Sequence, residues 1–257
     1  MDAVVIAGGI PKPEDPLYEY TQGGNKALLK ISGKSMAQWV LDALNKAERA
    51  ERIVIIGLPE ESQLNSEKIT ASIPNQGDLL SNIKAGVHKI IEINPRADRV
   101  LIVSSDIPTI KPEMINWLVE TCEQSEHDVY YTVVSKKVME ERFPESNRSY
   151  VKLKDMDLCG GDMNVIRAKL ISQNDDLWRR LVEARKNALK QAMLIGIDNL
   201  LLLLLRVIDL DGAVKRVSKR LNIRGRAILC PYAEIAMDVD KPHQLEIVRT
   251  DLDQQVS

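Results

Sequence analysis

The stretch Val4-Val5-Ile6-Ala7-Gly8-Gly9 decides the expected fold. An apolar, β-branched run that breaks into paired glycines is typical of a buried strand that ends in a loop of bare backbone. Main-chain N–H groups can approach an anion closely there, because no Cβ atom stands between them. Lys26 follows after a short loop and offers a compact positive charge to the same anion. The pattern predicts a site for the phosphates of a nucleotide.

Paired glycines after a strand most often form only a turn, and this alternative stays open at the level of the motif alone. The stretch is not the dinucleotide fingerprint G-x-G-x-x-G, and it is not a Walker loop, which needs G-K-[ST] at a helix start. The value of this motif as evidence for a nucleotide site therefore depends on acidic residues elsewhere in the chain.

Short β-branched runs alternate with helical patterns through the first half of the chain. Strands are predicted at residues 3–7, 53–56, 99–103 and 129–134, and helices at 35–46, 79–91 and 112–122. Such alternation predicts a three-layer α/β/α fold with a mostly parallel central sheet. We expect a single domain over residues 1–257, in which residues 144–225 form a largely helical elaboration on the acceptor side.

Composition narrows the partners and the compartment. A net charge of −2 makes nucleic acid an unlikely main partner, because no global basic field would attract it. The three cysteines form no C-x-x-C pair, which favours a reducing compartment. The start lacks the basic region of a signal peptide, and the leucine run 200–205 is far shorter than the roughly 20 residues of a membrane span. We expect a cytoplasmic protein with no integral membrane segment.

Two acidic constellations are candidate metal ligands. Asp106 directly follows an apolar strand, where one carboxylate, waters and phosphate oxygens can complete the octahedron that Mg²⁺ prefers. Asp238 and Asp240 stand two apart, so in an extended segment both would face one cation. Each of these residues can instead cap the helix that follows it, which is an ordinary structural role.

These residues together resemble the MobA-like and sugar-phosphate nucleotidyltransferases, a family with a GT-A-type fold. The matching motifs, in chain order, are Ala7-Gly8-Gly9, Asn25-Lys26-Ala27-Leu28, Gln76-Gly77-Asp78, Ser105-Asp106-Ile107-Pro108 and Asp238-Val239-Asp240-Lys241-Pro242. The resemblance covers most of residues 1–135 and the tail from about residue 226.

The resemblance implies a role for each motif. Ala7, Gly8 and Gly9 would hold the phosphates, and Lys26 would contact the α-phosphate. The base would meet Gln76 and Gly77, and Mg²⁺ would be held by Asp106 with Asp240 or Asp238. An oxygen of a phosphorylated small-molecule acceptor would then attack the α-phosphorus of an NTP and release pyrophosphate.

One part of the pattern departs from the family. Its first loop commonly carries an arginine that binds the triphosphate, whereas residues 10–16 here contain three prolines and no arginine. Lys12 can replace the charge but not the two-pronged hydrogen bonding of an arginine.

The acceptor side has weaker signals. Gly161 and Asn164 lie in a segment that resembles the acceptor-binding part of sugar-phosphate relatives, although a plain helix-start turn fits equally well. Basic residues further on could bind a phosphorylated acceptor or form a solvated helix face: Arg179, Arg180, Arg185 and Lys186. A homo-oligomer is compatible with the sequence.

The sequence thus favours a Mg²⁺-dependent nucleotidyltransferase in which Lys26 and Asp106 carry the chemistry. Two alternatives stay open. One is a GT-A-type glycosyltransferase that uses a nucleotide-sugar, and the other is a non-catalytic, regulatory nucleotide-binding protein.

Overall fold

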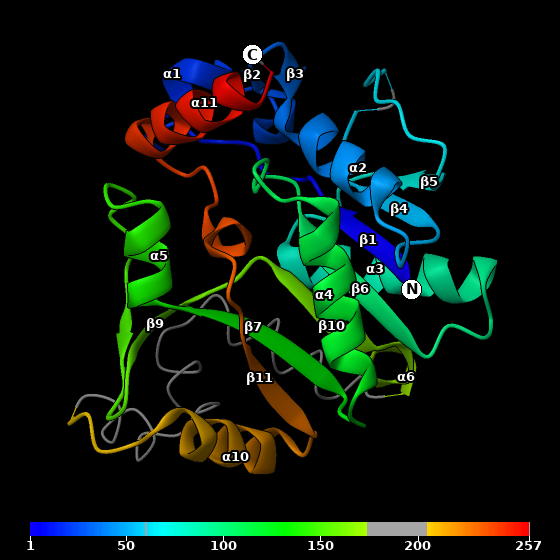
Figure 1. The fold of residues 1–257 in the computed structure, drawn as a ribbon. Helices are drawn as coiled ribbons and strands as arrows, with labels where there is room; N and C mark the ends of the chain where they lie inside the picture. Colours follow the sequence, from blue (N-terminus) through cyan, green and yellow to red (C-terminus); the bar gives the residue numbers. More distant parts are fainter. Residues whose placement is uncertain (60, 174–204, 257) are drawn as a thin grey trace.

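The computed structural model describes residues 1–59, 61–173 and 205–256. In this part of the chain a nine-stranded sheet runs in the order β5-β4-β1-β6-β10-β7-β9-β8, and β11 also pairs with β7. The strands are β1 (Asp2–Ile6), β4 (Ile53–Ile56), β5 (Ile69–Ile73), β6 (Arg99–Ser104), β7 (Val129–Ser135), β8 (Val151–Lys152), β9 (Asp157–Gly160), β10 (Met163–Arg167) and β11 (Gly225–Leu229). The predicted fold class, three layers around a mostly parallel sheet, is confirmed (Figure 1).

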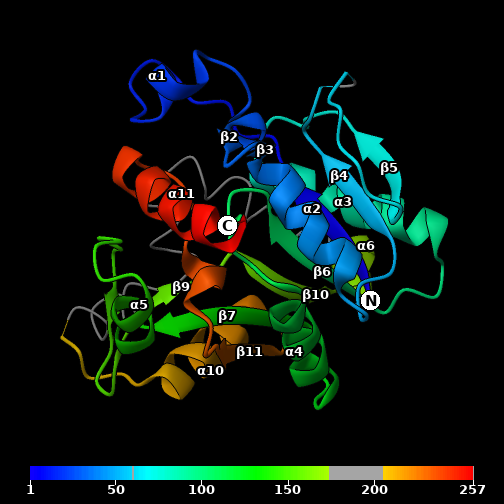
Figure 2. The same cartoon turned by 45° about the horizontal axis from the view of Figure 1, so that its top comes forward.

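Helices cover both faces of this sheet. One face packs against α2 (Met36–Lys46) and α4 (Pro112–Glu123), which contact each other, and the other packs against α3 (Leu79–Ile93) and α6 (Ala168–Gln173). Figure 2 shows the same layers from a second direction. The central strands β1 and β4 are buried along their whole length, as expected for strands covered on both sides.

Sequence capping signals place the helix starts. Ser35 accepts a hydrogen bond from the Gln38 amide at the start of α2, and Asp78 accepts two at the start of α3. Pro112 is the first residue of α4, where its missing N–H costs nothing. The close packing of α3 requires Gly86, because a Cβ there would lie 2.5 Å from Cγ1 of Val4.

The second half of the chain returns to the same sheet. Residues 144–225 contribute β8, β9 and β10 as well as α6 and α10 (Leu210–Leu221), and the remainder of the predicted helical elaboration, residues 174–204, lies outside the described residues. Strand β10 is antiparallel to both of its neighbours, β6 and β7. The chain then passes through β11 and a short 3₁₀ helix, Ala233–Ala236, to α11 (Pro242–Val256).

Smaller elements complete the described structure. They are α1 (Tyr18–Thr21), a 3₁₀ helix at Lys26–Leu28, the hairpin of β2 (Lys30–Ile31) and β3 (Lys34–Ser35), and α5 (Lys136–Arg142). Cys122, Cys159 and Cys230 are free and buried. Among the described helices, none is both long and apolar enough to cross a membrane. The leucines at 200–204 and the basic residues at 179–186 lie outside the described residues.

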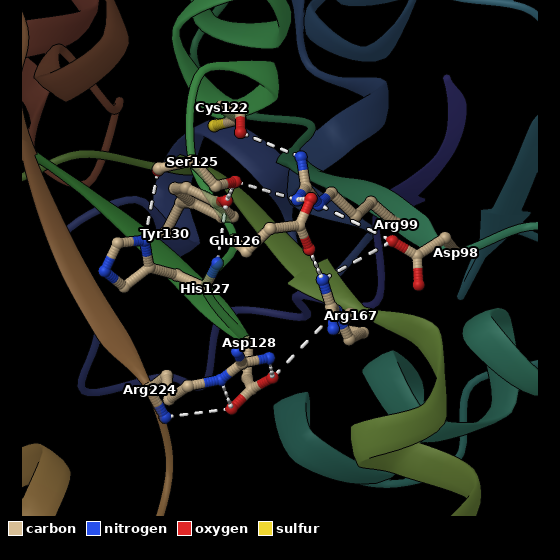
Figure 3. A network of polar contacts seen from close by, with 10 residues as sticks. All are labelled: Asp98, Arg99, Cys122, Ser125, Glu126, His127, Asp128, Tyr130, Arg167 and Arg224. Atoms are coloured by element: carbon tan, nitrogen blue, oxygen red, sulfur yellow. Dashed lines mark hydrogen bonds and ion pairs between the residues drawn. The ribbon is translucent and has the colours of Figure 1, made fainter.

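A network of charged and polar side chains joins strands at the edge where β6 and β7 begin (Figure 3). Arg99 donates to the backbone carbonyls of Cys122 and Ser125, each at 2.8 Å. Arg167, at the end of β10, pairs with Glu126, and Arg224, just before β11, pairs with Asp128 at 3.0 Å. This network fixes one edge of the sheet and lies opposite the edge described next.

Candidate functional site

The carboxyl ends of three parallel strands meet at one edge of the sheet. Gly8 and Gly9 follow β1, Gly57 follows β4, and Asp106 follows β6. Ligands of open α/β sheets bind at such an edge. The structure therefore places the predicted glycine loop and the predicted acid on the same rim.

Asn25 ties the loops of this rim together. Its Nδ2 donates to the carbonyl oxygens of Ala7 at 2.7 Å and of Gly57 at 2.9 Å. Its Oδ1 accepts from the Ala27 amide and so caps the short 3₁₀ helix that begins at Lys26. The Lys26 amide donates to the Gly9 carbonyl at 2.8 Å, so the backbone of Lys26 is fixed directly to the glycine loop.

Gly57 allows the two loops to approach closely. Its φ is +96°, and a Cβ at this position would lie 2.3 Å from Cα of Gly8. Only glycine allows both this positive φ and this close approach of the Gly8 backbone. The sequence showed Gly57 as the end of a strand and gave no sign of this contact.

The side chains of Lys26, Asp106 and Asp240 meet at the rim. Nζ of Lys26 lies 2.6 Å from Oδ2 of Asp106 and 2.6 Å from Oδ1 of Asp240. Ser104 donates to the other oxygen of Asp106 at 2.5 Å. The Val239 amide donates to the Asp106 carbonyl at 3.0 Å, which brings the segment before α11 alongside β6.

The electrostatics of this cluster keep the lysine charged. Burial of the Lys26 ammonium lowers its pKa, but the negative charges of Asp106 and Asp240 outweigh that effect and raise the pKa above its ordinary value. A fixed cation thus stands beside a glycine loop, where it can neutralise a phosphate.

Asp162 is a third acid of the site, and the sequence did not identify it as an acid of functional interest. Its backbone carbonyl accepts from the Ser104 amide at 2.9 Å, so it lies beside the end of β6. Burial raises the pKa of Asp162 to about 7, and the charges of Asp106 and Asp240 add to this effect while Arg148 and Lys26 oppose it.

A bulge brings Asp162 to the rim. In the pairing with β7, Val133 lies opposite Gly160 and Tyr130 lies opposite Val165. The segment from Gly160 to Val165 is therefore two residues longer than the segment of β7 that it faces. Gly161 lies in this irregularity, where a Cβ would meet Oγ1 of Thr132 at 2.3 Å. The segment joins two strands, and the alternative of a helix-start turn is wrong.

Asn164 and Gly161 have structural roles here. Oδ1 of Asn164 accepts from the Thr132 amide at 2.8 Å, and its Nδ2 donates to the Gly161 carbonyl at 3.1 Å. Both interactions hold the bulge in place. Their predicted contact with an acceptor stays a prediction.

Asn75 connects the segment of Gln76 and Gly77 to the glycine loop by hydrogen bonds. Asn75 Nδ2 donates to the Gly8 carbonyl at 2.9 Å, and Asn75 Oδ1 accepts from the Gly77 amide at 3.0 Å. Gly77 has a φ of +93°, and no atom of a residue other than Gly77 and its two chain neighbours lies within 4 Å of where its Cβ would be. The loop is therefore open next to the predicted phosphate site, as contact with a base requires.

Asp238 has a cationic partner other than Lys26. It is buried and pairs with Nη1 of Arg148. Among the described residues no group of three or more His, Cys, Asp or Glu side chains is placed to hold a metal ion. Asp106 and Asp240 are the two predicted metal ligands that the structure brings together at Lys26, and their oxygens suit Mg²⁺ with phosphate and water as further ligands. A metal-binding role of Asp238 stays a prediction.

A cavity of about 410 Å³ opens between the glycine loop and this cluster. Its walls are formed by Gly9, Ile10, Pro11, Asp15, Pro16, Leu17, Lys26, Asp240 and Lys241. The proline-rich first loop is thus one wall of the cavity. Lys12 is not part of that wall, and its amide donates to Asp15 at 2.7 Å. A larger cavity of about 780 Å³ between α5 and α11 has none of the predicted site residues in its walls.

The chain is similar to known proteins along most of its length. Residues 3–196 match the family model of the MobA-like NTP transferase domain. A hypothetical transferase from Thermus thermophilus has a similar solved structure, with 31% sequence identity, a TM-score of 0.82, and coverage of 95% of this chain and 98% of that one. A solved 4-diphosphocytidyl-2C-methyl-D-erythritol synthase, with 15% identity, a TM-score of 0.58 and coverage of 98% of both chains, shares the fold.

Two curated relatives are similar over shorter stretches. Probable molybdenum cofactor guanylyltransferases from Thermococcus sibiricus and Thermococcus kodakarensis are 28% identical over 126 residues and 27% identical over 105 residues. These alignments cover 49% and 40% of this chain, and 57% and 48% of the relatives. The chain thus spans about half the length of the curated relatives that it matches.

Proposed function

The chain belongs to the family of MobA-like NTP transferase domains, and from this membership and the rim geometry we propose that it is a nucleotidyltransferase. It transfers a nucleoside monophosphate from an NTP to a phosphorylated small molecule and releases pyrophosphate. The observation that carries the proposal is the position of Lys26 Nζ, 2.6 Å from both Asp106 and Asp240 and next to the glycine loop.

Each part of the rim has a role in this proposal. The bare backbone at Gly8 and Gly9 binds the phosphates, and Gln76 with Gly77 meets the base. Lys26 turns its ammonium group to the α-phosphate, where negative charge develops as the acceptor oxygen forms its bond and the bond to pyrophosphate breaks. Mg²⁺, held by Asp106 and Asp240, neutralises the triphosphate when bound.

The test is a pyrophosphate-release assay with each NTP, Mg²⁺ and a panel of sugar and polyol phosphates. Lys26→Ala and Asp106→Asn should each lower turnover about 10²–10³-fold, because each removes a charge that acts on the transferring group. Lys30→Ala and Asp42→Asn are matched controls, since Lys30 is exposed and Asp42 pairs with Lys34 outside the site. Normal turnover in either site variant would show that the assignment is wrong.

The same assay separates the proposal from its rivals. A glycosyltransferase would release an NDP from a nucleotide-sugar and no pyrophosphate from an NTP. A regulatory protein, favoured by the absence of an arginine from residues 10–16, would bind NTP in calorimetry without turnover on any acceptor.

A further inference from the structure

A second cavity shares two wall residues with the cavity beside the glycine loop. It has a volume of about 290 Å³, and Asp240 and Lys241 form part of its wall as they do for the first cavity. Arg148, Ser149, Gln244 and Gly160 form other parts of this wall. The two cavities therefore meet at the acid that contacts Lys26.

This arrangement matches what a transfer reaction needs. The attacking and leaving oxygens lie roughly in line at the α-phosphorus, so the acceptor must approach from the side opposite to pyrophosphate. A donor in the first cavity and an acceptor in the second would lie next to each other at Asp240, as this approach requires. The inference therefore depends on the proposed function for the identity of the donor side.

Arg148 supplies the positive charge of the second cavity. It lies in the loop between α5 and β8, and its Nη1 contacts Oδ1 of Asp238. Its side chain is 16% exposed and that of Asp238 is 12% exposed, so the contact fixes a largely buried guanidinium. An arginine offers five N–H donors in a planar fork, and one contact with a carboxylate leaves others for a ligand.

The wall carries two carboxylates and two cations, and each carboxylate has a cationic partner. Of its two carboxylates, Asp238 is paired with Arg148 and Asp240 is paired with Lys26, which lies on the donor side. Lys241 is exposed at the boundary and adds a second cation to the wall. Ser149 and Gln244 add hydrogen-bonding groups beside these charges.

We propose that this cavity is the acceptor site and that Arg148 binds a phosphate group of the acceptor. Asp238 holds the guanidinium in place, which gives this acid a role distinct from that of Asp240. The small volume fits a phosphate with a short polyol or sugar, or the phosphorylated end of a larger acceptor.

The experiment follows the Nε–Hε NMR signals of the arginine side chains while inorganic phosphate is added to the ¹⁵N-labelled protein. The Arg148 signal is assigned by its disappearance in Arg148→Lys, or in Arg148→Gln should the lysine variant not fold. In the wild-type protein the Arg148 signal should shift as phosphate is added, and the shift should saturate at high phosphate concentration. The Nε atoms of Arg148 and Arg99 are both buried without a hydrogen-bond partner. Arg99 lies in the network at the start of β6 and is the matched internal control, so its signal should stay in place.

Calorimetry gives the second measurement. Arg148→Lys should weaken phosphate binding at least about tenfold, because an ammonium cannot reproduce the fork, and should change NTP affinity less than about twofold. An Arg148 signal that does not move, or equal phosphate affinity in the variant, overturns the inference. Failure of the proposed function has a different signature, since the wild-type protein would then release no pyrophosphate from any NTP with any acceptor of the panel.

Discussion

Asp162 makes the stability of the protein depend on pH. Its pKa is raised by burial, and further by Asp106 and Asp240, from an ordinary value of 3.8 to about 7. A carboxyl with a raised folded-state pKa stabilises the fold below its unfolded pKa, and this contribution is lost as pH rises through about 7. At pH 8 the partly buried charge of Asp162 therefore destabilises the folded state.

Asp162→Asn removes this charge and keeps the shape. The variant should be more stable than wild type at pH 8, by about 1–3 kcal/mol, and should lose most of that advantage at pH 5. Thermal unfolding at both pH values, without divalent cations, measures the difference. Asp42→Asn is the control, and an advantage that is equal at pH 5 and pH 8 would contradict the prediction.

The residues of the site differ in how far the sequence could predict them. Asp106 could be predicted because it follows a strong strand signal, and parallel strands bring their ends to one edge. Lys26 could be predicted because it follows the loop that begins at the glycines after β1. Asp162 and Arg148 could not. The first reaches the rim through a bulge and an antiparallel strand, and the second lies in a loop with no periodic pattern. Asp238 and Asp240 looked equivalent in sequence, and only tertiary packing directs them to different partners.

At the scale of elements, the contact between α3 and the sheet depends on one missing methyl group. A Cβ on Gly86 would lie 2.5 Å from Cγ1 of Val4 and 2.7 Å from Cδ1 of Ile56, inside a buried core. Gly86→Ala should therefore destabilise the protein by about 1–3 kcal/mol, despite the better helix propensity of alanine.

Denaturant unfolding measures this cost. His88→Ala, at an exposed position of the same helix, is the matched control and should leave stability nearly unchanged. A Gly86→Ala protein as stable as wild type would mean that α3 can move away from β1 without loss.

The elements that the sequence predicted well are those with a strong period or a clear cap. Strands β1, β4 and β6 and helices α2 and α3 lie within two residues of their predicted bounds. The edge strand β5 was missed because its residues are only partly buried, and β9 and β10 because their pairing with distant strands decides their conformation. The helix α5 is only seven residues long and has one buried residue, so its periodic signal is weak.

At the scale of the whole molecule, the candidate site and the network of ion pairs lie at different edges of the sheet. One edge carries the glycine loop, Lys26 and the acids, and the other carries the network around Arg99 and Arg167 (Figure 3). The full length of the strands separates the two edges. Changes in the network should therefore affect the free energy of unfolding far more than the binding of a nucleotide at the other edge.

Arg167→Met tests this separation. The side chain of Arg167 is 8% exposed and pairs with Glu126, with further ionic contacts to Asp98 and Asp128 at 3.7 and 3.9 Å. Methionine keeps the aliphatic packing and removes the charge, while Asp128 retains Arg224 as its partner. We expect a loss of about 1–3 kcal/mol in the free energy of unfolding, because hydrogen bonds of a buried charged group are lost. Calorimetry at a temperature where the variant is folded should give an unchanged NTP affinity, and a large fall in that affinity would show that the two edges are coupled.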